Sequence, residues 1–140
     1  MGVGKDLWNQ FEALYSKKDF DGLASLFASD AVHVDPMGRR EGRKAIRAFF
    51  EAGDKALSDI RFEASVVIEE GDIVVAEWTW RGAFTGPLTM PDGTEIPATG
   101  KTLEHPGATI SDVRDGTFAT MRDYYDNTPW MMAFGLMPGT

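Results

Sequence analysis

Apolar residues recur at intervals of three and four over the first part of the chain, which is the spacing of an amphipathic α-helix. The pattern predicts a first helix over about 5–18, and a second, short helix capped by Asp19 and running through Leu26-Phe27. A third helix is expected to open at Gly42-Arg43. The residues that these helices would turn inward are Leu7, Trp8, Phe11, Leu14, Tyr15, Ile46, Phe49, Phe50 and Leu57.

The period of the pattern then shortens to two, as in strands that bury one face. Ile60–Glu69 and Ile73–Phe84 have the signals of a β-hairpin around the turn Glu70-Gly71-Asp72. Lys101–Val113 and Thr117–Tyr125 have the signals of a second hairpin. The second half of the chain is therefore predicted to be a sheet of long, paired strands.

The two hairpins are joined by Thr85–Gly100, whose Pro and Gly content predicts a long loop. Thr128-Pro129 is typical of a helix start and Gly135 of a helix end, so a short last helix is expected between them. Helices on only one face require a twisted sheet to curl around them. We expect one α+β domain over 1–140, with a cone-shaped, strongly curved antiparallel sheet wrapped around three N-terminal helices and a central pocket.

Composition and charge exclude several classes of function. The 140 residues, 43% of them hydrophobic, suffice for one core, and the absence of cysteine excludes disulfides, a thiolate nucleophile and a zinc knuckle. A net charge of −8 argues against nucleic acid as a partner. No apolar run is long enough for a bilayer and no signal-peptide pattern opens the chain, so we expect a cytoplasmic protein without a membrane partner.

One cluster of basic residues interrupts the acidic balance. It comprises Arg39, Arg40, Arg43, Lys44 and Arg47. Because Glu41 divides the cluster and acidic residues follow it, we interpret it as a solvated loop and helix face.

The candidate chemistry starts at a short β-like run, Ala31–Val34, that carries His33 and ends before Asp35. Side chains two residues apart in a strand point to the same side, so the imidazole and the carboxylate should lie together, as proton transfer would require. The alternative is that Asp35 before Pro36 only forms a turn and that His33 is solvated. On this stretch alone, the alternative is favoured.

Alternation along the predicted strands collects further side chains on one face. The pocket-facing set would comprise His33, Asp35, Trp78, Trp80, His105, Thr109, Asp123 and Tyr125. Aromatic walls with a few titratable groups suit a small apolar ligand that bears oxygen. Each assignment has a structural alternative: Trp78 and Trp80 as core or dimer-face residues, Asp123 as the ion-pair partner of Arg122, and His105 at an irregular strand edge.

Common cofactor and metal motifs are absent from the sequence. There is no glycine-rich phosphate loop, HExxH or Gly-x-Ser-x-Gly. A metal site built from His33, Asp35, His105 and Asp123 would have no recognised spacing. We therefore expect neither a cofactor nor a metal.

Several stretches together resemble the nuclear transport factor 2-like superfamily: SLFASDAVHVDPMG with EGRKAIRAFF, EEGDIVVAEWTWRGAFTGPL, PATGKTLEHPG and DGTFATMRDYYD. Within it, the chain is similar to SnoaL-type polyketide cyclases, ketosteroid isomerases and limonene epoxide hydrolases. The resemblance runs from about Leu7 to Leu136. It implies a conical sheet around a deep pocket, and a homodimer formed through the outer sheet face.

The isomerase resemblance implies a role for Asp35. The segment DAVHVDPMG is similar to the isomerase segment whose Asp shuttles the proton, and Asp35 holds that place. The positions of the isomerase's two oxyanion donors, a Tyr and a protonated Asp, fall here on Phe11 and on Thr109 or its neighbour. The known donor arrangement is therefore not present.

The other two families imply a role for the last strand. MRDYYD is similar to the epoxide hydrolase motif that carries its catalytic acid, at Asp123, but Trp78 and Trp80 stand where the companion Arg and Asp belong. In the cyclases, the acid–base Asp would fall near Asp126 or Asp123, and the strand His falls on Thr109. No parent active site is complete in this sequence.

The leading hypothesis is a cofactor-free isomerase, lyase or cyclase that acts by acid–base chemistry on a small hydrophobic carbonyl compound of the polyketide, steroid or terpenoid type. Asp35 would take the proton, His33 would tune it, and Asp123 or His105 would donate to the oxyanion. The residues expected to contact the substrate are Phe11, Tyr15, Phe50, Trp78, Trp80, Thr109, Tyr125 and Trp130. The alternatives are a non-catalytic binding module with the same pocket and, less favoured, a protein-interaction role for the outer sheet face.

Overall fold

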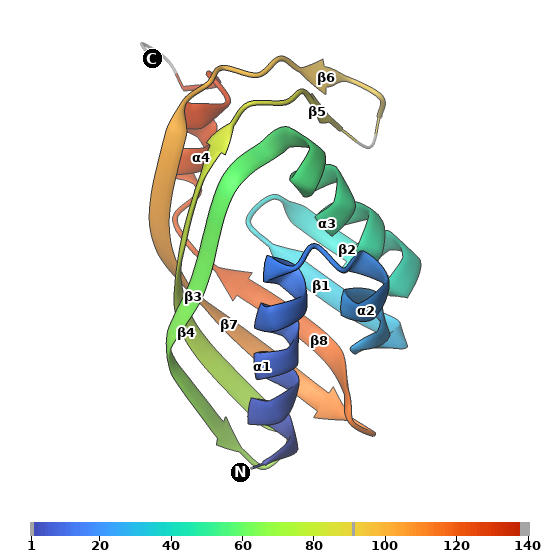
Figure 1. The fold of residues 1–140 in the computed structure, drawn as a ribbon. Coiled ribbons are helices and arrows are strands. Elements are labelled where there is room, and N and C mark those ends of the chain that lie inside the picture. The colour runs from blue at the N-terminus through green and yellow to red at the C-terminus, as the bar shows by residue number, and fades with distance from the viewer. Residues whose placement is uncertain (1, 91, 138–140) are drawn as a thin grey trace.

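Three helices pack against the concave side of one curved sheet in the computed structural model of the chain, which describes residues 2–90 and 92–137 (Figure 1). The helices are α1 (Val3–Ser16), α2 (Phe20–Ser25) and α3 (Arg43–Ala56), with a short α4 (Thr128–Ala133) near the C-terminus. All four were predicted within a few residues of these bounds. The cap of α2 is also confirmed, because Asp19 Oδ1 accepts a hydrogen bond from the Gly22 amide at 2.9 Å.

The main sheet has six strands in the order β2-β1-β8-β7-β4-β3. Their bounds are β1 (Phe27–Asp35), β2 (Gly38–Glu41), β3 (Leu57–Glu70), β4 (Ile73–Phe84), β7 (Thr102–Arg114) and β8 (Thr117–Tyr124). Neighbouring strands are antiparallel except β1 and β8, which run parallel. The expected antiparallel sheet is therefore mixed at this one pair, because β1 and β8 are far apart in the chain and are not joined by a hairpin.

Two short elements differ from the sequence prediction. The expected long loop holds a small hairpin of β5 (Leu88–Thr89) and β6 (Glu95–Ile96). The first part of the basic cluster forms β2, which folds back on β1 and pairs His33 with Arg40. The sequence GRRE of β2 is short and charged, which is typical of an edge strand.

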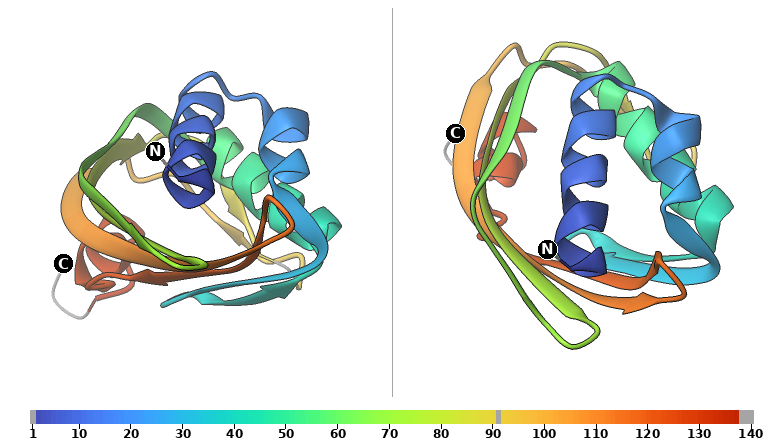
Figure 2. Two further views of the ribbon diagram at one scale, coloured as in Figure 1. Left: turned by 90° about the horizontal axis from the view of Figure 1, so that it is seen from below. Right: turned by 60° about the horizontal axis from the view of Figure 1, so that its bottom comes forward.

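Irregular pairing bends the sheet around the helices (Figure 2). The register of β3 against β4 shifts between Ser58 and Arg61 and again between Ala64 and Val66. Such bulges bend a strand and increase its local twist. Asp59, within the first shift, adopts a left-handed backbone with φ of 53°.

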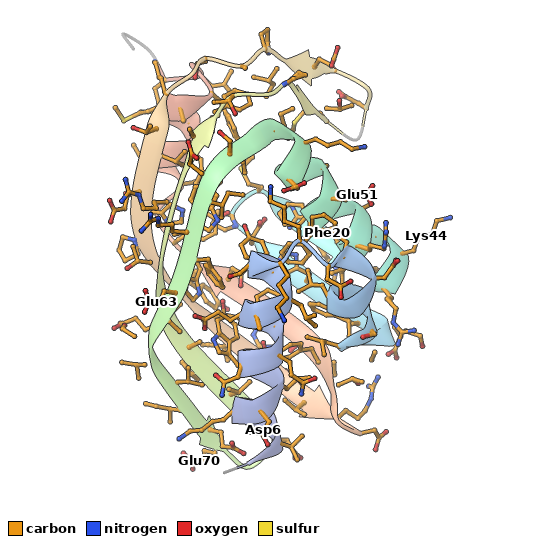
Figure 3. All side chains as sticks on the ribbon, viewed as in Figure 1. Asp6, Phe20, Lys44, Glu51, Glu63 and Glu70 are labelled. Carbon is orange, nitrogen blue, oxygen red and sulfur yellow. The ribbon has the colours of Figure 1, made fainter. Side chains whose placement is uncertain are left out.

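The core lies between α1 and the concave face of the sheet. Leu7, Trp8 and Phe11 are buried on the inner side of α1, as the helical period predicts. On the outer side of α3, Lys44 and Glu51 project away from the sheet (Figure 3). Within the described residues, no helix is both long enough and apolar enough to cross a membrane.

Candidate functional site

A pocket of about 700 Å³ lies between α1, α3 and the concave face of the sheet. It is lined by every predicted site residue except His33, namely Phe11, Tyr15, Phe50, Asp35, Trp78, Trp80, His105, Thr109, Asp123, Tyr125 and Trp130. His33 is fully buried behind the wall, with its ring centroid 5.2 Å from that of Phe49 and 5.6 Å from that of Phe50. The strand alternation thus predicted the lining side chains except at His33, which was expected in the pocket and does not line it.

Asp35 is the last residue of β1, and its two carboxylate oxygens have different hydrogen-bond partners. Its Oδ1 accepts hydrogen bonds from the backbone amides of Met37 (2.9 Å) and Gly38 (3.1 Å), which makes Asp35 the turn former of the β1–β2 connection. Its Oδ2 has one neighbouring donor, the Tyr125 hydroxyl at 3.4 Å. The turn role and the pocket role, which the sequence posed as alternatives, are therefore both present in one side chain.

Arg40 is the site residue that the sequence analysis missed. Its guanidinium pairs with Asp35 Oδ1 at 2.8 Å, lies 3.5 Å from His33 Nδ1 and stacks over the Phe49 ring at 3.7 Å. The interpretation of Arg40 as solvated was wrong, because its side chain is only 15% exposed. The position of Arg40 could have been predicted from the sequence, because a tight turn after Asp35 sets the register that places Arg40 opposite His33.

Asp123 is held by two side chains from neighbouring strands. Thr109 donates its hydroxyl proton to Oδ1 at 2.7 Å, and Oδ2 lies 2.8 Å from His33 Nε2. Since Arg40 can only donate toward His33 Nδ1, the imidazole donates from Nε2 to Asp123. The alternative pairing of Asp123 with Arg122 is wrong, because alternation turns Arg122 to the outer face, where it pairs with Asp112 at 2.8 Å.

The tryptophans that line the pocket donate their indole N–H hydrogen bonds to other residues of the protein. Trp78 donates to the Thr109 hydroxyl at 2.8 Å, and Trp80 donates to the Tyr15 hydroxyl at 2.9 Å. Trp78 and Trp80 are each 5% exposed and lie on the concave side, not on a dimer face. They line the pocket while also closing the core behind it.

Both ring nitrogens of His105 have partners in the protein. Nε2 accepts a hydrogen bond from the Trp130 indole at 2.7 Å, so Nδ1 carries the proton and donates to the Pro106 carbonyl at 3.0 Å. Desolvation lowers the pKa of His105 further below its usual range. The expected role of His105 as an oxyanion donor is not favoured by this geometry, which makes it a neutral part of the wall.

Two tyrosines supply hydroxyl groups to the pocket. Burial, reinforced by the charges of Asp35 and Asp123, raises the pKa of Tyr125 far above its usual value. Burial also raises the pKa of Tyr15 to about 12. Both phenols are therefore protonated near neutral pH and can donate hydrogen bonds.

Ligand atoms of His33, Asp35 and Asp123 lie within 4.8 Å of one another, a spacing that a metal ion could bridge. In this structure, however, Arg40 already supplies a cation to Asp35, and His33 Nε2 is committed to Asp123. Asp35 is thus already paired with a cation and the His33 nitrogen nearest to Asp123 is already used, so we assign no metal to this set.

Solved structures of similar shape cover almost the whole chain. TsrD from Streptomyces laurentii is 24% identical, with a TM-score of 0.79 and coverage of 96% of each chain. A proposed polyketide cyclase from Xanthomonas campestris pv. campestris is 26% identical, with a TM-score of 0.72 and coverage of 94% of this chain and 96% of the other. A protein of ketosteroid isomerase-like fold from Catenulispora acidiphila, solved with trimethylamine, is 22% identical, with a TM-score of 0.76 and coverage of 94% and 93%.

None of the curated proteins compared with this chain is similar enough to count as a relative. The family comparison, in contrast, matches the SnoaL-like domain over residues 8–121. That range holds Asp35, Arg40 and the tryptophans of β4, while Asp123 and Tyr125 follow directly after it. With this match and the nuclear transport factor 2-like fold of its structural neighbours, the chain belongs to the SnoaL-like domain family.

Proposed function

We propose that this protein is an acid–base enzyme that acts on a small, largely apolar carbonyl compound, as an isomerase, lyase or cyclase. The observation that carries the proposal is the free oxygen of Asp35. Asp35 lines the pocket, and its Oδ2 has a protonated phenol, Tyr125, 3.4 Å away. A base beside a hydrogen-bond donor is the minimum that enolate chemistry needs.

The proposed step is removal of a proton from the carbon next to the carbonyl group. The C–H bond breaks, the proton passes to Asp35 Oδ2, and the electron pair moves through the new C=C bond to the carbonyl oxygen. Tyr125 donates its hydroxyl hydrogen bond to that oxygen. Return of the proton to another carbon would give an isomerase, loss of a leaving group a lyase, and attack on a second carbonyl a cyclase.

Asp35 is a better base than Asp123 on geometric grounds. Each oxygen of Asp123 already accepts a hydrogen bond, from Thr109 or from His33. Asp35 has three donors on Oδ1 and only the long contact to Tyr125 on Oδ2. We assign Asp123 to orienting His33 through its hydrogen bond. His33 lies beside Arg40, and Arg40 holds the Asp35 side chain in place.

The comparisons support the substrate class without naming a substrate. One structural neighbour is a proposed polyketide cyclase, and polyketides are carbonyl compounds. The pocket wall of this chain is mostly aromatic, which suits a ligand with a flat or apolar body.

A second candidate is a binding module that uses the same pocket without chemistry. It is favoured by one observation, namely that Asp35 Oδ1 is fully engaged in the β1–β2 turn. A carboxylate placed only for that purpose would need no reactive oxygen. The two candidates differ in whether a bound ketone exchanges its protons.

The experiment is hydrogen–deuterium exchange at the α-carbon of a panel of aryl and alicyclic ketones in D₂O, followed by NMR. We expect the wild-type protein to accelerate exchange and Asp35→Asn to lose about 10²-fold or more of that rate. Glu77→Gln, on an exposed outward position of β4, is the matched control. A ketone that raises the thermal stability of the protein but exchanges at the solvent rate would favour the binding module.

A further inference from the structure

The pocket offers hydrogen-bond acceptors and few donors. The indole N–H groups of Trp78, Trp80 and Trp130 are consumed within the wall. In the part of the chain that the structure describes, the hydroxyl groups of Tyr15 and Tyr125 are the aromatic donors left to a ligand. Carboxylate oxygens stand opposite them as acceptors. An anionic ligand, which needs several donors, would find few here.

Acidic residues also outnumber basic ones around the pocket. The acidic lining residues are Glu12, Asp35, Asp54, Asp59, Glu63 and Asp123, against Lys18 and Arg61. Glu63 and Arg61 are exposed on either side of Phe62 on β3, so we count them as the rim of the pocket, where their opposite charges cancel. Glu63 points away from the helices (Figure 3). Lys18 is paired with Asp54 at 3.1 Å. The excess negative charge thus persists after the rim is discounted.

The inner carboxylates differ in how far their charge is compensated. Asp35 has Arg40 as its ion-pair partner, with 2.8 Å between the charged atoms. Asp123 has His33 at 2.8 Å, and no lysine or arginine pairs with it among the described residues. The His33 ring donates its Nε2 hydrogen to Asp123, because Arg40 faces the other ring nitrogen. One uncompensated negative charge therefore remains at the pocket wall.

Aromatic rings line the same pocket as that carboxylate, and the faces of such rings attract cations. Trp78 lies 6.0 Å from Tyr125, and Trp80 lies 4.6 Å from Trp130, measured between ring centroids. The wall already uses this attraction, because the Arg40 guanidinium stacks over Phe49 at 3.7 Å. Aromatic faces beside a carboxylate are the combination that recognises organic ammonium groups.

We propose that the pocket selects a carbonyl substrate that carries a positively charged nitrogen, as a protonated or quaternary amine, and that it rejects carboxylate and phosphate groups. The ammonium group lies among the aromatic rings beside Asp123, and the carbonyl group faces Asp35 and Tyr125. This inference rests on the proposed function for the choice of pocket and for the carbonyl group, and the preference for a cation is independent of it. Affinity alone tests it, with no need for turnover.

The test compares three acetophenones that differ only in the para substituent: trimethylammonio, tert-butyl and carboxylate. The first two have nearly the same shape, so they separate charge from size. Dissociation constants are measured on the full chain by calorimetry at low and high salt. We expect the trimethylammonio compound to bind on the order of tenfold more tightly than the tert-butyl compound, although the latter is more apolar. The carboxylate compound should not bind measurably.

Salt and substitution then locate the charge that selects the cation. Added salt should weaken binding of the trimethylammonio compound and leave the tert-butyl compound unchanged. Asp123→Asn should remove most of the preference between the two, and Glu77→Gln, which removes a negative charge from the outer face, should retain it. If Asp123→Asn fails to fold, the wild-type comparison still decides.

The proposal is overturned if the tert-butyl compound binds as tightly as the trimethylammonio compound, if the carboxylate compound binds, or if the cation does not bind at all. These outcomes are independent of the exchange experiment. A protein that binds the cation but exchanges no protons would lose the enzymatic proposal and keep this one. A protein that exchanges the protons of neutral ketones but does not bind the cation would keep the enzymatic proposal and lose this one.

Discussion

The pocket has two walls, and the histidine associated with each wall has a different kind of hydrogen-bond partner. The polar wall, made by β1, β2 and β8, presents Asp35 and Asp123 to the pocket, with His33 and Arg40 packed behind them. The aromatic wall, made by β4, β7 and α4, contains Trp78, Trp80, His105 and Trp130. Each wall has one of the two histidines of the chain. His33 links a carboxylate and an arginine, whereas His105 is fixed by an indole and a backbone carbonyl.

The difference shows that neighbours, not residue type, decide what a buried histidine does. Both imidazoles are almost fully buried, at 0% and 4% exposure. His33 contacts Asp123 and Arg40, and Arg40 pairs with Asp35. A change in the hydrogen bonds of His33 therefore changes the surroundings of both carboxylates. His105 has a neutral donor and a neutral acceptor, and it changes nothing beyond the shape of the wall. Reactivity is therefore expected in the polar wall and shape selection in the aromatic wall.

The largest expected effect separates the two walls by activity. Asp35→Asn should reduce ketone α-proton exchange by about 10²-fold or more, because the base is lost. Trp130→Phe should reduce it less than about tenfold, because the aromatic body remains. Exchange rates measured by NMR at saturating ketone check this, with circular dichroism to confirm folding. Equal losses in both variants would contradict the division between the walls.

Arg40→Ala should have the largest effect on stability. Removing the guanidinium leaves Asp35 as a buried carboxylate without its ion-pair partner, which costs about 3 kcal/mol. Arg40→Lys should recover part of this, since it restores the charge but not the planar contacts with Asp35 and Phe49. Urea unfolding curves give the difference. The matched control is Arg39→Ala, in the same strand, whose side chain is 60% exposed; a similar loss there would refute the role of Arg40.

Tyr125→Phe tests the donor of the polar wall. Loss of the hydroxyl should lower the exchange rate by roughly tenfold while leaving affinity for the ketone nearly unchanged, because the donor acts mainly on the developing enolate oxygen. Steady-state kinetics that separate kcat from KM provide the measurement. Tyr124→Phe, at the exposed last residue of β8 and next to Tyr125 in the chain, should have no effect.

The smallest effect is a pH dependence of stability from the aromatic wall. Because burial lowers the pKa of His105 in the folded protein below its ordinary value of 6.5, the unfolded chain binds the proton more readily. His105 therefore supports full stability above about pH 6.5, and this contribution is lost as pH falls below that value. Thermal unfolding between pH 7.5 and 5 should show a smaller decline for His105→Gln than for the wild type. Parallel curves would mean that His105 does not contribute.

Hydrophobic periodicity was enough to locate the helices and strands and to identify their inward faces. The three- and four-residue spacing around Phe11 and the alternation through Trp78 and Trp80 placed these side chains correctly, because burial of one face imposes that periodicity on helices and strands. The same alternation brought His33 and Asp35 to one side. Neither inference required knowledge of any partner far along the chain.

The partners of those side chains, in contrast, follow from how distant segments pack in the folded chain. Arg40 has the same local pattern as its exposed neighbours, and becomes part of the site because β2 folds back onto β1. His105 loses its expected donor role because its Nε2 accepts a hydrogen bond from Trp130. Trp130 lies 25 residues later in the chain. Hydrogen bonds and ion pairs depend on distances between distant segments, which hydrophobic periodicity does not encode.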